Sequence, residues 1–427
     1  MKLKSPSIRF GAALAVLAAV TLCAGRLYSE QVGNKGELKA WERSFRECKE
    51  YLAKAKELDE DMKDAARKIA DEAAKFYIYR ITHRGDIKFS QVHSDFDTDM
   101  EAAKKGKNKE FKEMLAPCLV QSMKDVLGKQ DLKKDREVIA SAAVMLPSMA
   151  KIRHEKVGEY LVELIKEEKT SPPVRYYAIK ALKEQLPITV QPANADANPK
   201  SDEGQKRQKE ADYVDVLTKV IETKINVNGM VPEEVEAHRF VRRAALESLS
   251  AARSPAVHAG RLGGKAVLQG PVAPTLLKVL VKGALTPEPN LQDKIEAALG
   301  LCIMEYPNAE EYNPELATFL IGQTLAEFAA AYSDEWAVID AGKKTPSLPY
   351  KSVAERFKKN LAIMAKLPDP DGKKLASTAD KLLDKIKLHK ELQDADVDAF
   401  REKLPRQPKA TKAFKKLDTP EILKALK

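Results

Sequence analysis

Apolar residues recur every three or four positions along most of the chain, the spacing that predicts amphipathic helices. In the segment 36–75 one such stripe would be buried, formed by Trp41, Phe45, Cys48, Leu52 and Ala55. The pattern breaks at 76–89, where we expect the end of a helix followed by a loop, with a short hairpin around 84–86 as the alternative. Over 154–168 the predicted buried stripe consists of Val157, Tyr160, Leu161, Leu164 and Ile165.

The stretch SPPVRYYAIKALKEQL (171–186) predicts a helix that begins at two prolines, which suit a first turn because that turn needs no backbone donor. Ser171 precedes them as an N-cap candidate. The stretch FVRRAALESL (240–249) repeats the same skeleton. Weaker matches lie upstream around Leu146 and downstream in LQDKIEAALGL (291–301). The predicted buried face of 171–186 is Val174, Ala178, Ala181, Leu182 and Leu186.

The distances between these matches support a repeat. Counted at the shared leucines Leu146, Leu182, Leu249 and Leu299, the offsets are 36, 67 and 50 residues. We expect two irregular insertions, a disordered polar segment at 187–212 and a Gly-rich loop at 258–270. Without their 26 and 13 residues the later offsets become 41 and 37. All three then lie near the period of about 40 residues of two-helix repeats.

PPVRYYAIKAL and FVRRAALESL resemble the Val-Arg-x-x-Ala-apolar-x-Ala-Leu signature of HEAT repeats, over about 131–306. The resemblance implies a right-handed α-solenoid of stacked helix pairs with a role in binding or scaffolding, and it implies no catalytic residues. Stacking would bury the apolar face that one helix pair cannot bury alone. An irregular helical bundle with a coincidental motif is the alternative.

The predicted fold class is all-α, with irregular HEAT-like pairs between helical extensions at both ends. The expected regions are a signal peptide or uncleaved anchor at 1–25, a helical region at 26–130, the repeats at 131–306 and a Lys-rich helical region at 307–427. Within the last region we expect helices at 313–332, 350–367, 368–388 and 417–427. A loop is expected at 333–349.

Composition agrees with a helical protein. Hydrophobic residues make up 44% and aromatic residues 6% of the chain, and its 19 glycines are too few for a typical β-sandwich or barrel. The net charge is +10, and the segment 341–427 holds 22 Lys and Arg against 12 Asp and Glu, the same surplus. We read these charges as a solvated helical surface, with contact to an anionic polymer or membrane surface as the alternative.

The first 25 residues have the pattern of an export signal. Lys2, Lys4 and Arg9 precede an uncharged run, FGAALAVLAAVTLCAG, that is short for a membrane span. The segment therefore predicts an exported protein, periplasmic or associated with the cell envelope, and leaves cleavage, lipidation at Cys23 and a retained anchor open. The remaining cysteines, Cys48, Cys118 and Cys302, are too few for a disulfide framework, and the last two are expected to be buried.

Few motifs in the chain suggest chemistry. HSDFDTDM (93–100) sets Asp95, Asp97 and Asp99 at alternate positions, which in an extended loop could converge on a cation. GRLGGKA (260–266) lacks the first Gly and the Ser or Thr of a phosphate loop. The six histidines have no zinc-ligand spacing. We therefore predict no metal, no cofactor and no catalytic residue.

The sequence favours a non-enzymatic scaffold that binds an unknown protein partner outside the cytoplasm. Candidate partner-binding residues are Tyr176, Arg242 and Arg243. Alternatively, the aliphatic part of the Arg242 side chain could cover the contact between two helices. One alternative is an enzyme subunit, or a HEAT protein that acts as a lyase or chaperone. Another is binding of an anionic envelope polymer or lipid surface through 341–427. Nucleic acid is not expected as a partner.

Overall fold

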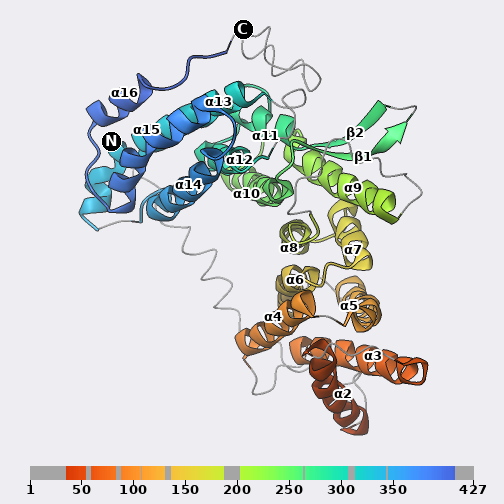
Figure 1. The fold of residues 1–427 in the computed structure, drawn as a ribbon. Helices are drawn as coiled ribbons and strands as arrows, with labels where there is room; N and C mark the ends of the chain where they lie inside the picture. Colours follow the sequence, from red (N-terminus) through yellow and green to blue (C-terminus); the bar gives the residue numbers. More distant parts are fainter. Residues whose placement is uncertain are drawn as a thin grey trace. The chain divides into compact units, whose positions relative to one another are not determined.

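The computed structural model describes residues 35–53, 59–82, 88–106, 108–129, 136–186, 202–262, 265–305, 313–342 and 345–408. These residues form helices and one β-hairpin, so the prediction of a helical fold is confirmed (Figure 1). Four predicted features lie outside the described residues: the signal peptide or anchor at 1–25, the chain reversal expected around 83–87, the first part of the insert at 187–201 and the last helix.

The chain divides into two compact units, and the division falls within two helices. The first unit holds Met1–Tyr160 with Ser171–Tyr177, and the second holds Leu161–Thr170 with Ala178–Lys427. The two helices are α7 (Glu155–Lys166) and α8 (Pro172–Leu182). Each unit is described by itself below.

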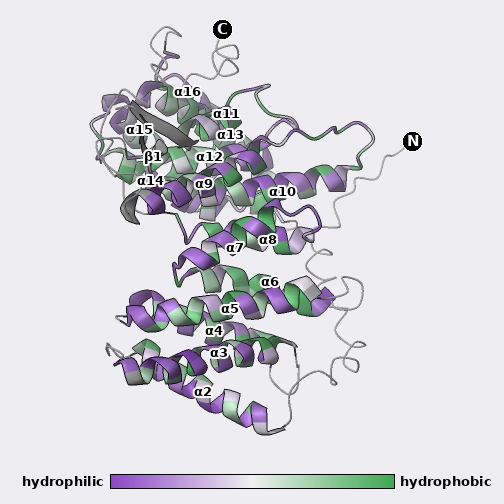
Figure 2. Ribbon diagram, turned by 90° about the vertical axis from the view of Figure 1, so that its right-hand side faces the viewer, coloured by the Kyte–Doolittle hydropathy of each residue, from purple (hydrophilic) through white to green (hydrophobic). Residues whose placement is uncertain are grey.

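In the first unit, α3 contacts α2, α4, α5 and α6, and α6 also contacts α4 and α5. Aromatic side chains connect the first three helices, since the Phe45 ring lies 5.0 Å from Tyr77, which lies 4.8 Å from Phe96. Figure 2 shows hydrophilic and hydrophobic residues alternating along these helices, as expected of amphipathic elements. The helices are α2 (Lys35–Ala53), α3 (Glu60–Thr82), α4 (Phe89–Lys105), α5 (Lys109–Lys129) and α6 (Arg136–Ala150).

Most apolar stripes predicted from the sequence are buried. In α2, Phe45, Cys48 and Leu52 are buried and Trp41 is half-buried, while Ala55 lies outside the described residues. All five predicted residues of 154–168 and all five of 171–186 are buried, which confirms these two faces. Cys302 is buried as predicted, but Cys118 is half-buried.

The start of α8 follows the sequence prediction in part. The helix begins at Pro172, and the Arg175 N–H donates to the carbonyl of Ser171 at 3.0 Å. The Ser171 hydroxyl has no hydrogen-bond partner among the described residues, so the prediction of a side-chain cap is wrong. Two prolines without N–H groups leave this hydroxyl few donors to accept from, which removes the usual reason for a cap.

The second unit contains two series of helices that contact one another in chain order. In the first series α9 contacts α11, which contacts α13; in the second, α10 contacts α12, which contacts α14. The series are joined by contacts of α9 with α10 and of α12 with α11 and α13. The helices are α9 (Asp202–Glu222), α10 (Pro232–Leu249), α11 (Ala273–Leu280), α12 (Leu291–Cys302), α13 (Pro314–Asp340), α14 (Tyr350–Met364), α15 (Pro370–Lys387) and α16 (Asp394–Arg401), with a 3-10 turn at Ser250–Ala252.

A β-hairpin replaces the predicted Gly-rich loop at 258–270. Strands β1 (Ala256–Leu262) and β2 (Lys265–Pro271) pair antiparallel, with Ala256 opposite Pro271 and Leu262 opposite Lys265. The physical reason is local, because two seven-residue runs flank Gly263 and Gly264, and a Gly-Gly pair between two runs is a hairpin signal. Both strands contact α9.

Two other boundaries differ from prediction. Residues 202–212 of the expected disordered insert belong to α9, whose Ala211, Tyr213 and Val214 are buried, so packing and good helix formers order this part. The expected loop at 333–349 begins later, because α13 continues to Asp340 and ends only before Gly342, which has φ of 58°.

The apolar faces predicted for α14 and α15 are buried in the structure. In α14 the predicted residues Val353, Phe357, Leu361 and Met364 are all buried. In α15 the buried face contains the predicted Leu375, Ala379, Leu382 and Ile386. The helix α15 starts at Asp369, whose carboxylate accepts from the N–H groups of Asp371 and Gly372 and from the Thr318 hydroxyl at 2.9 Å. This cap ties the start of α15 to α13.

Candidate interaction surface

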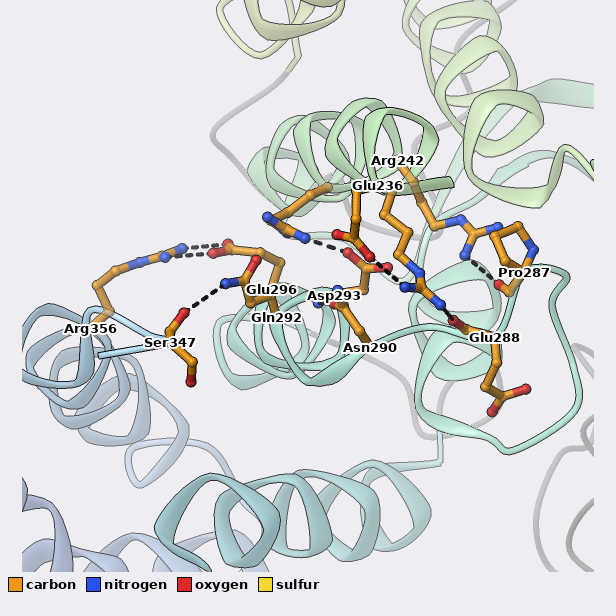
Figure 3. A network of polar contacts seen from close by, with 12 residues as sticks. Glu236, Arg242, Pro287, Glu288, Asn290, Gln292, Asp293, Glu296, Ser347 and Arg356 are labelled. Atoms are coloured by element: carbon orange, nitrogen blue, oxygen red, sulfur yellow. Dashed lines mark hydrogen bonds and ion pairs between the residues drawn. The ribbon is translucent and has the colours of Figure 1, made fainter. Parts of the chain in front are cut away.

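Two neighbouring arginines of α10, Arg242 and Arg243, contact different elements of the second unit, and Figure 3 shows Arg242 beside Pro287. The helix begins at Pro232, and the side chain of Glu234 accepts the N–H of Val231 at 3.2 Å, which fixes its first turn. From this helix Arg242 reaches the loop before α12, whereas Arg243 reaches α12 itself. The sequence predicted both as partner-binding residues, and the structure separates their roles.

Arg242 is fully buried, with an exposed fraction of 0%. Its Nη1 donates to the carbonyl of Pro287 at 2.7 Å, while Nε and Nη2 have no hydrogen-bond partner among the described residues. Burial lowers the pKa of Arg242, and nearby Asp293 opposes that effect. Arg242 is therefore not a surface residue, which corrects the expectation that it contacts a partner and agrees with the alternative that it fills the seam between elements.

His238 lies one turn before Arg242 on α10. Burial and the positive charge of Arg242 lower the pKa of His238, and a hydrogen bond with the backbone of Thr223 acts in the opposite direction. Its Nε2 has no hydrogen-bond partner in the described part of the chain. The neutral imidazole is the form that avoids a second positive charge beside Arg242.

Arg243 forms an ion pair with Asp293 of α12. The Arg243 Nε lies 3.3 Å from the Asp293 Oδ1, and Asp293 is fully buried. The N–H of Asp293 donates to the side chain of Asn290, which caps α12 at 3.0 Å. Burial raises the pKa of Asp293, against the lowering effect of Arg243 and Arg242. Arg243 therefore holds α10 to α12, and it is only partly exposed.

The same helix α12 is joined to α14 one turn further on. Arg356 donates to both carboxylate oxygens of Glu296, at 2.6 and 2.5 Å. The Asn360 Nδ2 donates to the carbonyl of Leu299 at 2.9 Å, and the Gln292 Nε2 donates to the carbonyl of Ser347 at 3.3 Å. The helix α14 and the loop before it thus contact α12 at three points, and Figure 3 shows two of them, Arg356 with Glu296 and Gln292 with Ser347.

The ion pairs continue toward α8 and form what we call the second-helix ladder: Lys183–Glu247, Arg243–Asp293 and Glu296–Arg356. The Lys183 Nζ lies 3.1 Å from Glu247 on α10. Each pair joins one element of the series to the next, so the ladder runs across α10, α12 and α14. Such pairs fix neighbouring helices in register more than they add stability, because most are partly exposed.

One large apolar side chain is exposed beside this ladder. Phe240 of α10 is 50% exposed. It shares a helix face with Glu236, Arg243 and Glu247, because their spacings of four, three and four residues place them on one stripe. An exposed aromatic residue surrounded by charged residues is typical of a binding hot spot with a polar rim. Sequence reasoning missed Phe240, although its position at the start of the FVRRAALESL motif could have pointed to it.

Tyr176, the third predicted residue, belongs to the first unit. It is half-buried, and its ring meets that of Tyr177 edge to face at 5.1 Å. Its contact with a partner stays a prediction.

The acidic motif 93–100 lies on helix α4, so the expectation of an extended loop is wrong. Residues two positions apart point to different sides of a helix, so the three carboxylates do not converge. Asp95 accepts from Arg80 at 2.8 Å, Asp97 from Lys151 at 2.7 Å and Asp99 from the Tyr77 hydroxyl at 2.6 Å. Burial raises the pKa of Asp99 despite that hydrogen bond. Asp95 and Asp99 join α4 to α3, and Asp97 joins it to the turn after α6.

Within the described residues no group of three or more His, Cys, Asp or Glu side chains is placed to hold a metal ion. In the same part of the chain, no helix combines the length and the apolar character that a membrane crossing requires. No protein-family model matches the sequence. No curated protein matches it either.

Proposed function

We propose that the protein is a non-enzymatic scaffold that binds a protein partner outside the cytoplasm. In this proposal α9 to α14 are stacked HEAT-like helix pairs, with α9, α11 and α13 as the first helices and α10, α12 and α14 as the second. The contacts of each helix with the next of its own series support this arrangement.

The observation that supports a binding role most is the surface of α10. Phe240 is 50% exposed, although exposure of such a large apolar side chain to water is energetically unfavourable. The second-helix ladder beside it holds α10 and α12 in fixed positions, so the surface is organised before a partner arrives. Partner binding would bury Phe240 within a charged rim.

Export from the cytoplasm is part of the proposal and rests on the first 25 residues. A basic segment followed by a short uncharged run is typical of a signal peptide. Mass spectrometry of the mature N-terminus tests this part, because a retained Met1 without membrane association would contradict export.

Site-specific photo-crosslinking tests the binding role. A benzophenone side chain placed at position 240 should give a discrete adduct with one protein in cells. The same group at Lys381, an exposed position of α15, is the matched control and should not give that adduct. Equal adducts at both positions, or none at position 240, would contradict a partner surface on α10.

A further inference from the structure

The outer surface of α14 and α15 is strongly basic. Between Tyr350 and Lys387 there are ten Lys and Arg residues against five Asp and Glu. Six exposed lysines on these helices and in the turn between them form no ion pair with any described residue, and we call them the α14–α15 basic face: Lys351, Lys359, Lys366, Lys373, Lys374 and Lys381.

The spacing of these lysines places them on the solvent side of each helix. In α14 the apolar face with Val353 and Phe357 is buried, whereas Lys351 and Lys359 lie on the exposed side two turns apart. Lys366 is exposed in the turn directly after the helix. In α15, Lys374 and Lys381 are seven residues apart and therefore share a face.

The two helices lie side by side, so their lysines contribute to one surface. Lys358 of α14 forms ion pairs with Asp380 at 2.9 Å and with Asp384 of α15. These pairs occupy two of the five acidic residues, and a third, Asp369, is buried as the cap of α15. Glu355 and Asp371 remain to offset six lysines, so the basic face has a clear positive surplus.

An exposed apolar residue lies at the end of this face. Leu388 follows α15 directly and is 57% exposed, and its position continues the stripe of Lys374 and Lys381 at the same seven-residue interval. Lysines beside an exposed leucine are the combination by which proteins attach to a charged bilayer, with the lysines at the headgroups and the leucine at the acyl boundary.

The composition of the face argues for a lipid surface over a nucleic acid. The one arginine of α14 and α15, Arg356, is engaged by Glu296, so the face offers lysine point charges without planar guanidinium groups. The aromatic residues of these helices, Tyr350 and Phe357, are buried and cannot stack on bases.

We propose that the α14–α15 basic face, together with Leu388, docks the protein on an anionic lipid bilayer. This inference goes beyond the proposed partner binding through α10 and does not depend on it. The bilayer would hold the chain by headgroup charge and by shallow burial of one leucine, and the two surfaces could be occupied at the same time.

Cosedimentation of the full chain with vesicles tests the proposal. Vesicles of phosphatidylcholine and phosphatidylglycerol in equal amounts should bind the protein, and vesicles of phosphatidylcholine alone should not. The Lys359→Gln, Lys366→Gln, Lys381→Gln triple variant should lose affinity by about fivefold per lysine, roughly 100-fold in total. Salt at about 1 M, where the Debye length is about 3 Å, should release most of the protein.

A matched triple variant controls for net charge. Lys206, Lys224 and Lys282 are exposed lysines elsewhere in the second unit, and their replacement by Gln removes the same charge. This control should keep most of the vesicle affinity, while Leu388→Gln should lower it on the order of tenfold. All substituted side chains are exposed, and matching thermal melts would show that the fold is intact.

One result of these experiments would support the proposal, and two would overturn it. Preferential loss of vesicle binding in the first triple variant supports the proposal. Equal losses in both triple variants would assign the binding to net charge and overturn it. Binding of dextran sulfate without binding of anionic vesicles would assign the face to a soluble polymer and would also overturn it.

Discussion

Arg356 of α14 and Glu296 of α12 form an ion pair through both oxygens of the carboxylate, with the Nη1–Oε1 and Nη2–Oε2 distances at 2.6 and 2.5 Å. The hydrogen bonds that Arg356 donates to Glu296 raise the pKa of Arg356, even though its burial acts against them. Glu296 is 13% exposed and Arg356 is 43% exposed, so solvent screens the pair in part. The geometry makes this the best-defined link of the second-helix ladder.

A double-mutant cycle measures that link. Arg356→Gln, Glu296→Gln and the double variant should give a coupling free energy of about 1 kcal/mol, because a two-point pair with one partner only 13% exposed exceeds an ordinary surface pair. The Lys183–Glu247 pair is the control, since both partners are exposed and one contact joins them. Urea unfolding provides the free energies. A coupling no larger than that of the Lys183–Glu247 pair would contradict the prediction that Arg356–Glu296 is the strongest link of the second-helix ladder.

Gly300 tests the packing of α12 on the turn after α10. A Cβ at this position would lie 2.2 Å from the Ser250 Oγ and 3.0 Å from the Leu276 Cδ1. We expect Gly300→Ala to destabilise the protein by about 1–3 kcal/mol, the usual range for overpacking. Gly128→Ala is the matched helical control, because nothing lies within 4 Å of its Cβ, and it should be neutral or stabilising. Thermal unfolding of the two variants gives the comparison.

Ionisation of Asp293 should lower the stability of the folded protein as pH rises. Burial raises its pKa above the ordinary 3.8, so the folded state retains the proton more readily than the unfolded state. Its stabilising contribution is full below the unfolded pKa and is lost as pH rises through the folded pKa. The uncharged Asp293→Asn variant should therefore gain stability relative to the wild type as pH rises over that window.

Asp396 is the control of opposite sign. A hydrogen bond from Lys385 lowers the pKa of Asp396, so its stabilising contribution is present above the unfolded pKa and is lost as pH falls through the folded pKa. Asp396→Asn should lose stability relative to the wild type as pH rises. Urea unfolding between about pH 3 and pH 7 compares the two variants. The same pH trend in both would refute the assignment of Asp293.

Substitutions at Arg242 distinguish a structural role from a need for charge. Arg242→Lys should lower the free energy of unfolding by about 2 kcal/mol. An ammonium group does not reproduce the geometry of the planar guanidinium that donates to the Pro287 carbonyl, and it is costly to bury. Arg242→Met should cost less, since no charge then remains buried. If the Met variant is the less stable of the two in urea unfolding, the charge itself is required.

The sequence predicted the buried helix faces well, because each face is set by spacing within one helix. Val174 and Ala178 in α8, and Val353 and Phe357 in α14, are buried as their periodicity predicts. Local pattern could not show that α4 is continuous through Asp95 and Asp97, since alternate acids also suit a loop. In the structure they contact Arg80 of α3 and Lys151, which directly follows α6, and both partners are distant in the sequence.

The candidate surface was harder to predict, because burial of a polar residue depends on distant segments. Arg242 matches a helix motif, but its acceptor Pro287 lies 45 residues further along the chain. The same holds for Arg356, whose partner Glu296 is 60 residues away. Phe240 is apolar, so periodicity alone would place it inside, whereas the structure leaves it half exposed.

Partner binding through α10 is tested most directly by comparing two exposed apolar positions, Phe240 and Leu388. Phe240→Asp should abolish the complex between the full chain and the protein crosslinked at position 240, as measured by size-exclusion chromatography of the purified pair. Leu388→Asp should leave that complex intact, because Leu388 lies on the α14–α15 basic face. A complex that survives Phe240→Asp in a folded variant would contradict a partner surface on α10.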